Sequence, residues 1–258
     1  MAYENLLFEV EGKIAIITMN RPKALNALND GLLKDLNSAL DEVSGNADIK
    51  GAIITGAGKS FVAGADISQM ADYTPEECRA YMGYAQQTFN RIESIEKPIM
   101  AAVNGYALGG GNELCMACDF RYASEAALFG QPEVNLGIMP GFGGSQRLPR
   151  LVNPGVAKEI IFSGRNLKAD EALKIGLVSK VTAPDDLLPE AKKIMATIVS
   201  KPAHSLRYCK VSINRGQDTD LYKAIELELD LVSLCFSSPD QKEGMKAFLE
   251  KRPAQFKS

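Results

Sequence analysis

The chain has 258 residues, of which 46% are hydrophobic and 24% are charged; this composition is typical of a folded globular protein with one large or two small domains. The formal net charge of −3 at pH 7 provides no overall positive field that would concentrate nucleic acid or an anionic membrane. The sequence also lacks a secretory signal and any apolar run approaching the roughly 18 residues of a membrane span. We therefore expect a cytoplasmic protein that binds neither nucleic acid nor membranes.

The first half of the chain predicts strands alternating with helices. Leu32, Leu36 and Leu40 repeat at helical spacing and predict a helix over 30–43, and a capping box at 74–77 begins a second helix that reaches about residue 95. Several strand candidates are apolar on both faces, as in a buried and mainly parallel sheet. The order is β–β–α, repeated irregularly. The strand candidates, each interrupted or ended by Asn or Gly, are 12–20, 49–58, 98–107 and 119–130.

From about residue 153 onward the pattern indicates helices. Tyr222, Ile225, Leu229 and Val232 repeat at three- and four-residue steps, which predicts an apolar helix face that is either internal core or a subunit contact. No Ser/Gly-rich linker separates the two halves, so we expect the tail to pack as a helical extension. The last predicted strand is 176–181, and the predicted helices lie around 171–172 and at 187–199, 203–213, 221–236 and 241–251.

The segment from Pro98 to Asp119 carries the strongest chemical signal. Its apolar run leads through three consecutive glycines, 109–111, into helix-forming residues that include Glu113. Glycines permit a sharp turn and close approach of another molecule, and the first N–H groups of a helix have no internal partner. The segment predicts either a site that stabilises an oxyanion beside a carboxylate, or an ordinary strand–turn–helix corner with a surface glutamate.

A second carboxylate, Glu133, follows Pro132 in an apolar and glycine-rich stretch. Apolar neighbours raise the pKa of a carboxyl group, which gives an enzyme an acid that keeps its proton near neutral pH. The alternative is a loop carboxylate that caps the N–H groups of Gly137 or Gly141. Two such carboxylates beside one oxyanion site would favour catalysis.

Other motifs are weaker. His204 is the only histidine and lies in a predicted helix, so carboxylates are the expected proton carriers. Cys115 and Cys118 form a C-x-x-C pair without a second pair to complete a zinc site, and we expect them to pack in the core. No metal site is predicted. The glycines at 56–60 and 105–109 do not have the spacing of a P-loop or of a dinucleotide-binding motif.

Six segments together resemble successive blocks of the crotonase, or enoyl-CoA hydratase, family. They occur in the family's order over essentially the whole chain, which makes the resemblance far more specific than any single motif. The segments are NRPKALNAL (20–28), FVAGADISQM (61–70), NGYALGGGNEL (104–114), FGQPEVNLGIMPGFGGSQRL (129–148), ADEALKIGLVSKV (169–181) and EGMKAFLEKRPAQF (243–256).

The resemblance implies an α/β fold, with a crotonase-like ββα spiral core over 1–200 that holds an acyl-CoA site. A C-terminal helical region, 201–258, would serve trimerisation and cover the active site, and the protein would form a homotrimer or homohexamer. By this resemblance Glu113 and Glu133 are the catalytic carboxylates, and the N–H groups of Ala65 and Gly110 form an oxyanion hole. The positions that match contacts to substrate or coenzyme A are Lys23, Leu25, Ala63, Asp66, Ile67, Ser68, Gly141 and, in the tail and often reaching a neighbouring subunit, Phe248 and Lys251.

The implied activity is reversible hydration of a short-chain 2-trans-enoyl-CoA to the 3-hydroxyacyl-CoA, as in fatty acid or butyrate metabolism, with no cofactor beyond the coenzyme A of the substrate. We expect Glu113 to take a proton from water as it attacks C3, and Glu133 to deliver one to C2. Because both carboxylates are present, hydration is favoured over isomerisation or another enolate reaction on this scaffold. RNA binding, found among some relatives, is disfavoured by the acidic charge. Asn112 and Ser68 depart from residues common in the family, Cys and Lys, which predicts altered affinity or chain-length preference.

Overall fold

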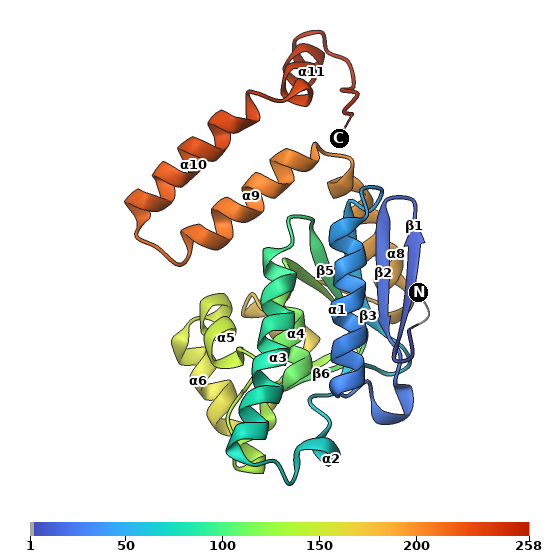
Figure 1. Ribbon diagram of the computed structural model, residues 1–258, viewed down its shortest axis with the longest axis vertical. Coiled ribbons are helices and arrows are strands. Elements are labelled where there is room, and N and C mark those ends of the chain that lie inside the picture. Colours follow the sequence, from blue (N-terminus) through green and yellow to red (C-terminus); the bar gives the residue numbers. More distant parts are fainter. Residues whose placement is uncertain (1–2, 258) are drawn as a thin grey trace.

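The computed structural model, in which residues 3–257 are described, contains two β-sheets flanked by helices (Figure 1). The larger sheet is parallel except for the antiparallel pair at its edge, β1 and β2. Its strands, in spatial order, are β1 (Leu6–Glu11), β2 (Ile14–Met19), β3 (Gly51–Gly56), β5 (Ile99–Val103), β7 (Phe120–Ser124) and β10 (Lys180–Thr182). The smaller sheet contains β4 (Ser60–Val62), β6 (Tyr106–Leu108), β8 (Leu128–Gly130) and β9 (Asn166–Lys168).

From β3 to β8, consecutive strands of the chain alternate between the two sheets, which produces a spiral. β3, β5 and β7 lie side by side in the larger sheet, and the strand that follows each of them, β4, β6 or β8, lies in the smaller sheet. The chain passes between sheets at close quarters: a Cβ on Gly105 would lie 2.0 Å from the carbonyl oxygen of Lys59. The predicted ββα spiral is confirmed, whereas the predicted single strands 98–107 and 119–130 are wrong, since each contains two strands that turn a corner.

Helices cover the sheets and complete the core. A large apolar cluster joins the sheets to the long helices α1 (Asp30–Gly45) and α3 (Pro75–Ser94), and a smaller cluster lies beneath α8 (Leu187–Val199) on the other face of the larger sheet. The predicted capping box is present, because the Thr74 side chain accepts from the Glu77 N–H while the Glu77 side chain accepts from the Thr74 N–H. The remaining core elements are η1 (Pro22–Ala24), α2 (Ile67–Met70), α4 (Gly110–Ala117), η2 (Pro132–Leu136), α5 (Gly144–Val152), α6 (Pro154–Ser163), α7 (Ala169–Lys174) and η3 (Pro184–Asp186).

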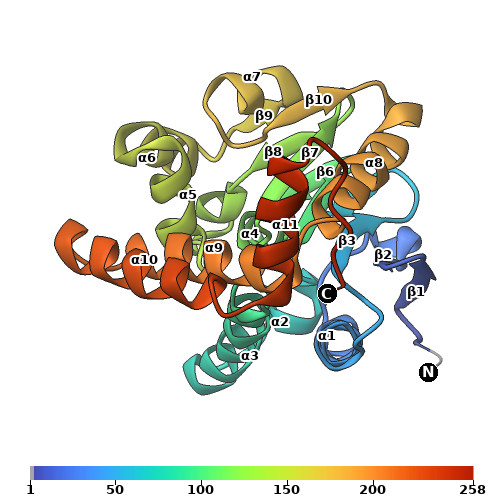
Figure 2. The same cartoon turned by 90° about the horizontal axis from the view of Figure 1, so that it is seen from above.

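The tail consists of α9 (Ala203–Gly216), α10 (Leu221–Cys235) and α11 (Pro239–Leu249), as predicted from helical spacing. Figures 1 and 2 show α9 and α10 side by side, and Figure 1 shows α11 at the end of the tail, away from the sheets. The tail contacts the core through α9, where the Lys210 ammonium lies 3.0 Å from the Asp119 carboxylate. None of the residues of α9 or α10 is buried. The helical extension is therefore joined to the core mainly at α9, and Asp218, just after this helix, forms an ion pair with Arg150 at 3.8 Å.

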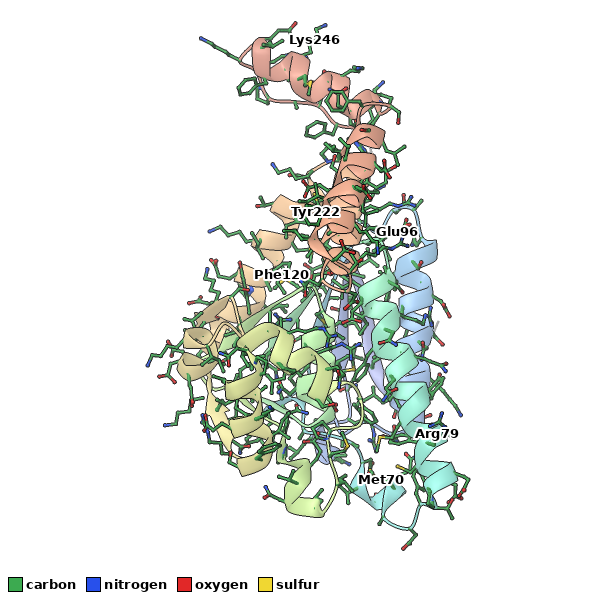
Figure 3. All side chains as sticks on the ribbon, turned by 90° about the vertical axis from the view of Figure 1, so that its left-hand side faces the viewer. Met70, Arg79, Glu96, Phe120, Tyr222 and Lys246 are labelled. Atoms are coloured by element: carbon green, nitrogen blue, oxygen red, sulfur yellow. The ribbon has the colours of Figure 1, made fainter. Side chains whose placement is uncertain are left out.

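The apolar face of α10 lies on the surface of this chain. Tyr222 is 82% exposed and Leu229 is 63% exposed, and Figure 3 shows Tyr222 on a helix that stands apart from the sheets. Of the two interpretations that the sequence left open, internal core is wrong. Within residues 3–257, no helix is long and apolar enough to cross a membrane.

Candidate active site

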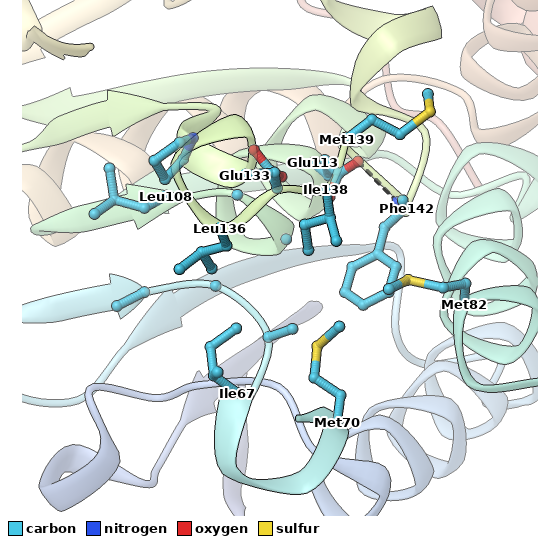
Figure 4. Close-up of a pocket in the computed structure, with 17 residues that line it drawn as sticks. Ile67, Met70, Met82, Leu108, Glu113, Glu133, Leu136, Ile138, Met139 and Phe142 are labelled. Carbon is cyan, nitrogen blue, oxygen red and sulfur yellow. Dashed lines mark hydrogen bonds between the residues drawn. The ribbon is translucent and has the colours of Figure 1, made fainter. Parts of the chain in front are cut away.

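A cavity of about 140 Å³ lies where the two glutamates predicted from the sequence come together. Figure 4 shows Glu113 and Glu133 on one side of this cavity and Ile67 and Met70 on the other. Most of the lining side chains are apolar, so the two carboxylates have mainly apolar neighbours. The lining residues are Ala63, Gly64, Ala65, Ile67, Met70, Met82, Leu108, Gly109, Gly110, Glu113, Pro132, Glu133, Leu136, Ile138, Met139, Gly141 and Phe142.

The glycines at the start of α4 allow the helix to approach its neighbours more closely than any side chain would permit. A Cβ on Gly111 would lie 1.8 Å from the carbonyl oxygen of Val62, and one on Gly110 would lie 2.8 Å from the Phe142 ring. Gly109 has a φ of +49°, and a Cβ there would lie 3.1 Å from a Glu133 carboxylate oxygen. The glycines thus bring the N-terminus of α4, β4 and the second glutamate into one site.

Ala65 and Gly110 line this cavity, and their backbone N–H groups have no acceptor among the described residues. Gly110 is the first residue of α4, so its N–H has no partner inside the helix. Around Ala65, the Leu28 N–H donates to the Gly64 carbonyl and the Asp66 N–H donates to the Leu28 carbonyl, at 2.9 and 2.7 Å. This parallel bridge fixes the backbone on both sides of Ala65. Neither N–H group is therefore used in a hydrogen bond within residues 3–257.

Glu113 lies in the first turn of α4 and is 1% exposed. Its Oε1 accepts hydrogen bonds from the N–H groups of Phe142, at 2.8 Å, and Gly144, at 2.6 Å. Burial, the largest effect, and the nearby Glu133 carboxylate together raise the pKa of Glu113 to about 8, against the opposing effect of the two N–H groups. Glu113 is therefore a buried carboxyl group with one fully partnered oxygen.

Glu133 belongs to η2, at the edge of the cavity. Its Oε1 accepts a hydrogen bond from the Gln131 side-chain amide at 3.2 Å, whereas its Oε2 is buried and has no partner among the described residues. Burial raises the pKa of Glu133 to about 6. The alternative prediction, in which this carboxylate caps Gly137 or Gly141, is wrong for Gly137, because that N–H donates to backbone carbonyls of Glu133 and Val134.

The structure gathers seven of the predicted site residues around the cavity: Ala63, Ala65, Ile67, Gly110, Glu113, Glu133 and Gly141. Four others lie on the adjoining segments of the chain. Lys23 is exposed in η1, and the Leu25 carbonyl accepts from the Ala63 N–H at 3.1 Å. Asp66 is bonded to the Ser68 hydroxyl at 2.6 Å and to Arg21 at 3.0 Å, which lowers the pKa of Asp66.

The two tail positions lie elsewhere. Phe248, in α11, is 82% exposed, and Lys251 follows that helix. Figure 3 places Lys246 of α11 and Met70 of the cavity at opposite ends of the chain. Within one chain, the structure therefore does not bring Phe248 and Lys251 to the site.

Several residues around the site were not predicted from the sequence. Gln131 is fully buried beside Glu133, and Met82 and Phe142 close the cavity. Arg147 donates to the Phe142 carbonyl at 2.9 Å. Asn26 is fully buried with a φ of 60°, and its side-chain amide donates to the carbonyls of Ala57, which follows β3, and of Ser60 and Phe61 in β4. A buried amide or arginine carries no signal in a single sequence, because its partners come from distant segments.

The cysteines and the histidine behave as structural residues. Cys115 and Cys118 are buried in α4 and at its end, as predicted, and burial raises the pKa of the Cys115 thiol to about 12. His204 contacts the hydroxyls of Ser205, in α9, and Ser238, just before α11. Among residues 3–257 there is no group of three or more His, Cys, Asp or Glu side chains arranged to hold a metal ion.

A family model described as enoyl-CoA hydratase/isomerase matches residues 9–258. The chain belongs to the enoyl-CoA hydratase/isomerase family. It is 53% identical to a crotonyl-CoA hydratase of Syntrophomonas wolfei, with 99% of both chains covered. It is 51% identical to a short-chain-enoyl-CoA hydratase of Clostridium acetobutylicum, with 98% of this chain and 97% of that protein covered. The crystal structure of an enoyl-CoA hydratase from Bacillus anthracis superposes with a TM-score of 0.95 at 38% identity, covering 98% of this chain and 99% of that one. The resemblance and the fold class predicted from the sequence are thereby confirmed.

Proposed function

We propose that this protein catalyses the reversible hydration of short-chain 2-trans-enoyl-CoA, such as crotonyl-CoA, to the 3-hydroxyacyl-CoA. The observation that carries the proposal is the pair of glutamates, buried Glu113 and partly exposed Glu133, on one wall of an apolar cavity beside two N–H groups that have no acceptor among the described residues. The similarity to relatives named crotonyl-CoA hydratase and short-chain-enoyl-CoA hydratase supports the same activity. Coenzyme A enters as part of the substrate, and the proposed reaction needs no further cofactor.

In this proposal the thioester carbonyl accepts hydrogen bonds from the N–H groups of Ala65 and Gly110. Polarisation of the carbonyl makes C3 electrophilic, and addition of water at C3 places negative charge on the thioester oxygen. Fixed donors that face this developing charge lower the barrier, and loss of one such donor typically costs about 3–4 kcal/mol. The close packing of the glycines in α4 supports the proposal, because it holds the Gly110 N–H in place before substrate binds.

The two carboxylates hold one proton between them near neutral pH, since the pKa of Glu113 is about 8 and that of Glu133 is about 6. In the substrate-free protein the proton is on Glu113, because Glu113 has the higher pKa. The hydrogen bonds favour the opposite arrangement: two N–H groups stabilise an anion on Glu113, whereas the unpartnered Oε2 of Glu133 is suited to carry a proton. Substrate displaces water from Glu133 and disfavours its charged form, and the two N–H bonds persist. The proton therefore moves to Glu133 in the complex.

With this distribution, a water molecule attacks C3: the water oxygen bonds to C3 while Glu113 accepts a proton from the water. Glu133 then transfers its proton to C2. The electron pair of the C2–C3 double bond passes through the enolate to form the new C2–H bond. These two transfers leave the proton on Glu113 and the negative charge on Glu133, which is the distribution of the substrate-free protein. An isomerase would need only proton transfers between carbon atoms, so a glutamate placed to activate water favours hydration.

The test uses crotonyl-CoA hydration, followed by loss of enoyl-thioester absorbance, together with exchange of the C2 protons of butyryl-CoA with D₂O. Exchange requires the proposed oxyanion hole and Glu133 but no attack by water. We expect Glu113→Gln to lose hydration and keep exchange, and Glu133→Gln to lose both. Hydration that survives in either variant would refute the paired mechanism. A wild type that does not hydrate crotonyl-CoA would favour an isomerase or another enolate reaction.

We also propose that the protein acts in the cytoplasm as a homotrimer or homohexamer. The exposed apolar face of α10, with Tyr222 and Leu229, supports a contact between copies. In such an assembly Phe248 and Lys251 are available to the site of a neighbouring copy. Sedimentation of the wild type and of Tyr222→Asp and Leu229→Asp tests this: we expect dissociation of the variants, and a monomeric wild type would refute the proposal.

A further inference from the structure

The loop that holds Glu113 is tied to one face of α3. Its residues, 141–144, supply the two N–H groups that donate to Glu113. Gln86, Asn90 and Glu93 are four and three residues apart, so they share one face of α3. From this face the Gln86 side-chain amide donates directly to the Gly141 carbonyl at 2.7 Å. The other two residues act through a single side chain of α5, Arg147.

Arg147 uses all three nitrogen atoms of its guanidinium group. Nε and Nη2 donate to the two carboxylate oxygens of Glu93, at 2.7 and 2.9 Å, and Nη2 also donates to the Asn90 side chain at 2.7 Å. Nη1 donates to the Phe142 carbonyl at 2.9 Å. The Arg147 side chain is 12% exposed. The Glu93 side chain is 41% exposed, and the bidentate contact together with the bonds to Asn90 and Phe142 fixes the orientation of the guanidinium group.

The loop has a glycine where the Arg147 guanidinium group reaches the Phe142 carbonyl. Gly143 has a φ of +107°, and a Cβ there would lie 2.2 Å from Nη1 of Arg147. Gly143 therefore permits Arg147 to reach the Phe142 carbonyl while the adjacent peptide groups turn toward Glu113. The carbonyl of Phe142 faces Arg147 and its N–H faces Glu113.

We propose that Arg147 is a positioning residue for the hydration reaction: held by Asn90 and Glu93 of α3, it fixes the Phe142 carbonyl so that the N–H groups of Phe142 and Gly144 stay directed at Glu113. The inference rests on the proposed function, because it assigns Glu113 the role of base. Loss of this support destabilises the Glu113 anion in two ways, through misaligned N–H groups and through loss of a nearby cation. The other charged group with a resolved influence on Glu113 is Glu133 of η2.

The experiment compares four variants on crotonyl-CoA as a function of pH. Arg147→Gln removes the charge and the guanidinium group. Arg147→Lys keeps the charge, but an ammonium group cannot donate to Glu93, Asn90 and Phe142 in the same geometry. Glu93→Gln weakens the anchor on α3 and leaves Arg147 in place. Arg150→Gln is the matched control, because Arg150 lies on the same helix and donates to the Gln146 carbonyl of that helix rather than to the loop.

We expect Arg147→Gln to lower kcat by about 10- to 100-fold, with KM changed less than about threefold, as for a displaced catalytic group with intact binding. The limb of the kcat–pH profile that reports Glu113 moves to higher pH by at least about half a unit. Arg147→Lys loses a similar factor in kcat with a smaller shift of the limb, and Glu93→Gln changes both in the same direction. Arg150→Gln matches the wild type.

An unmoved limb with kcat within about twofold of the wild type in both Arg147 variants would overturn the proposal. So would equal losses in Arg147→Gln and Arg150→Gln, which would mean a general effect on α5. If Arg147→Gln does not fold, Arg147→Lys and Glu93→Gln decide by the same criteria. Hydration that survives Glu113→Gln would instead refute the proposed role of Glu113, so the two failures are distinguishable.

Discussion

Replacement of Glu113 by Gln separates the electrostatics of the site from its catalysis. The folded protein keeps the Glu113 proton up to about pH 8, whereas an unfolded chain loses it near the ordinary value of 4.5. Between these values the folded state binds more protons than the unfolded state, so the free energy of unfolding falls as pH rises. The difference between the two pKa values corresponds to a loss of about 5 kcal/mol in the free energy of unfolding once Glu113 is fully ionised.

The glutamine side chain introduced by Glu113→Gln is neutral at every pH, and its amide oxygen can still accept from the N–H groups of Phe142 and Gly144. We therefore expect the free energy of unfolding of Glu113→Gln, minus that of the wild type, to increase by about 4 kcal/mol between about pH 5 and pH 9. Equilibrium urea denaturation at a series of pH values and one fixed protein concentration measures this difference.

Glu133→Gln is the matched comparison. Burial raises the pKa of Glu133 only to about 6, and this side chain is partly exposed. The free energy of unfolding of Glu133→Gln relative to the wild type must therefore increase less with pH than that of Glu113→Gln, and the increase must be complete at lower pH. A difference between Glu113→Gln and the wild type that stays constant from pH 5 to pH 9 would refute the reasoning. Such a result would mean that Glu113 titrates in the folded protein as it does in the unfolded chain.

Three further substitutions test the packing around the site. Gly144→Ala places a Cβ 2.4 Å from the Gln131 amide and 2.9 Å from Glu113 Oε1; we expect a loss of at least about tenfold in kcat on crotonyl-CoA, and wild-type kinetics would contradict the close contact. Met82→Ala removes the thioether that lies against Gly141 and lines the cavity; kcat/KM should rise for hexenoyl-CoA relative to crotonyl-CoA, and an unchanged ratio would show that Met82 does not limit the cavity. Asn26→Ala leaves three carbonyls without their amide donor and puts alanine at positive φ, so we expect about 3 kcal/mol of destabilisation in urea; a loss below about 1 kcal/mol would count against this role.

Local features of the sequence predicted most of the elements correctly. The leucine spacing of α1 and the capping box of α3 act within a few residues, and they were found because neighbouring residues alone determine them. The strand boundaries within 98–107 and 119–130 were not found, because the corner at Gly105 depends on the approach of Lys59 from another segment. The short strands β1 and β9 and the helices α5 and α6 were also missed.

The same division applies to the site. A glycine-rich helix start with Glu113, and Glu133 in an apolar stretch, were visible in the sequence as residue types in unusual surroundings. Their assignment as catalytic carboxylates came from resemblance to a family, and this role, like that of Ala65 and Gly110, stays a prediction. The positions Lys23, Leu25, Asp66 and Ser68 lie on segments adjoining the cavity, and Phe248 and Lys251 depend on a second copy of the chain.

The sequence by itself determined the ββα order and the two acidic residues, because these follow from spacing along the chain and from residue type. It also determined the family, through the resemblance of its segments to the family's blocks. Only the tertiary structure decided that Glu113 and Glu133 share one cavity, that their pKa values rise to different extents, and that α3 holds the 141–144 loop through Arg147. Burial and hydrogen-bond partners are set by segments that are distant along the chain, such as those of Arg147 and Glu93, which are 54 residues apart. The chemistry of a carboxylate therefore depends on which distant groups the fold places beside it.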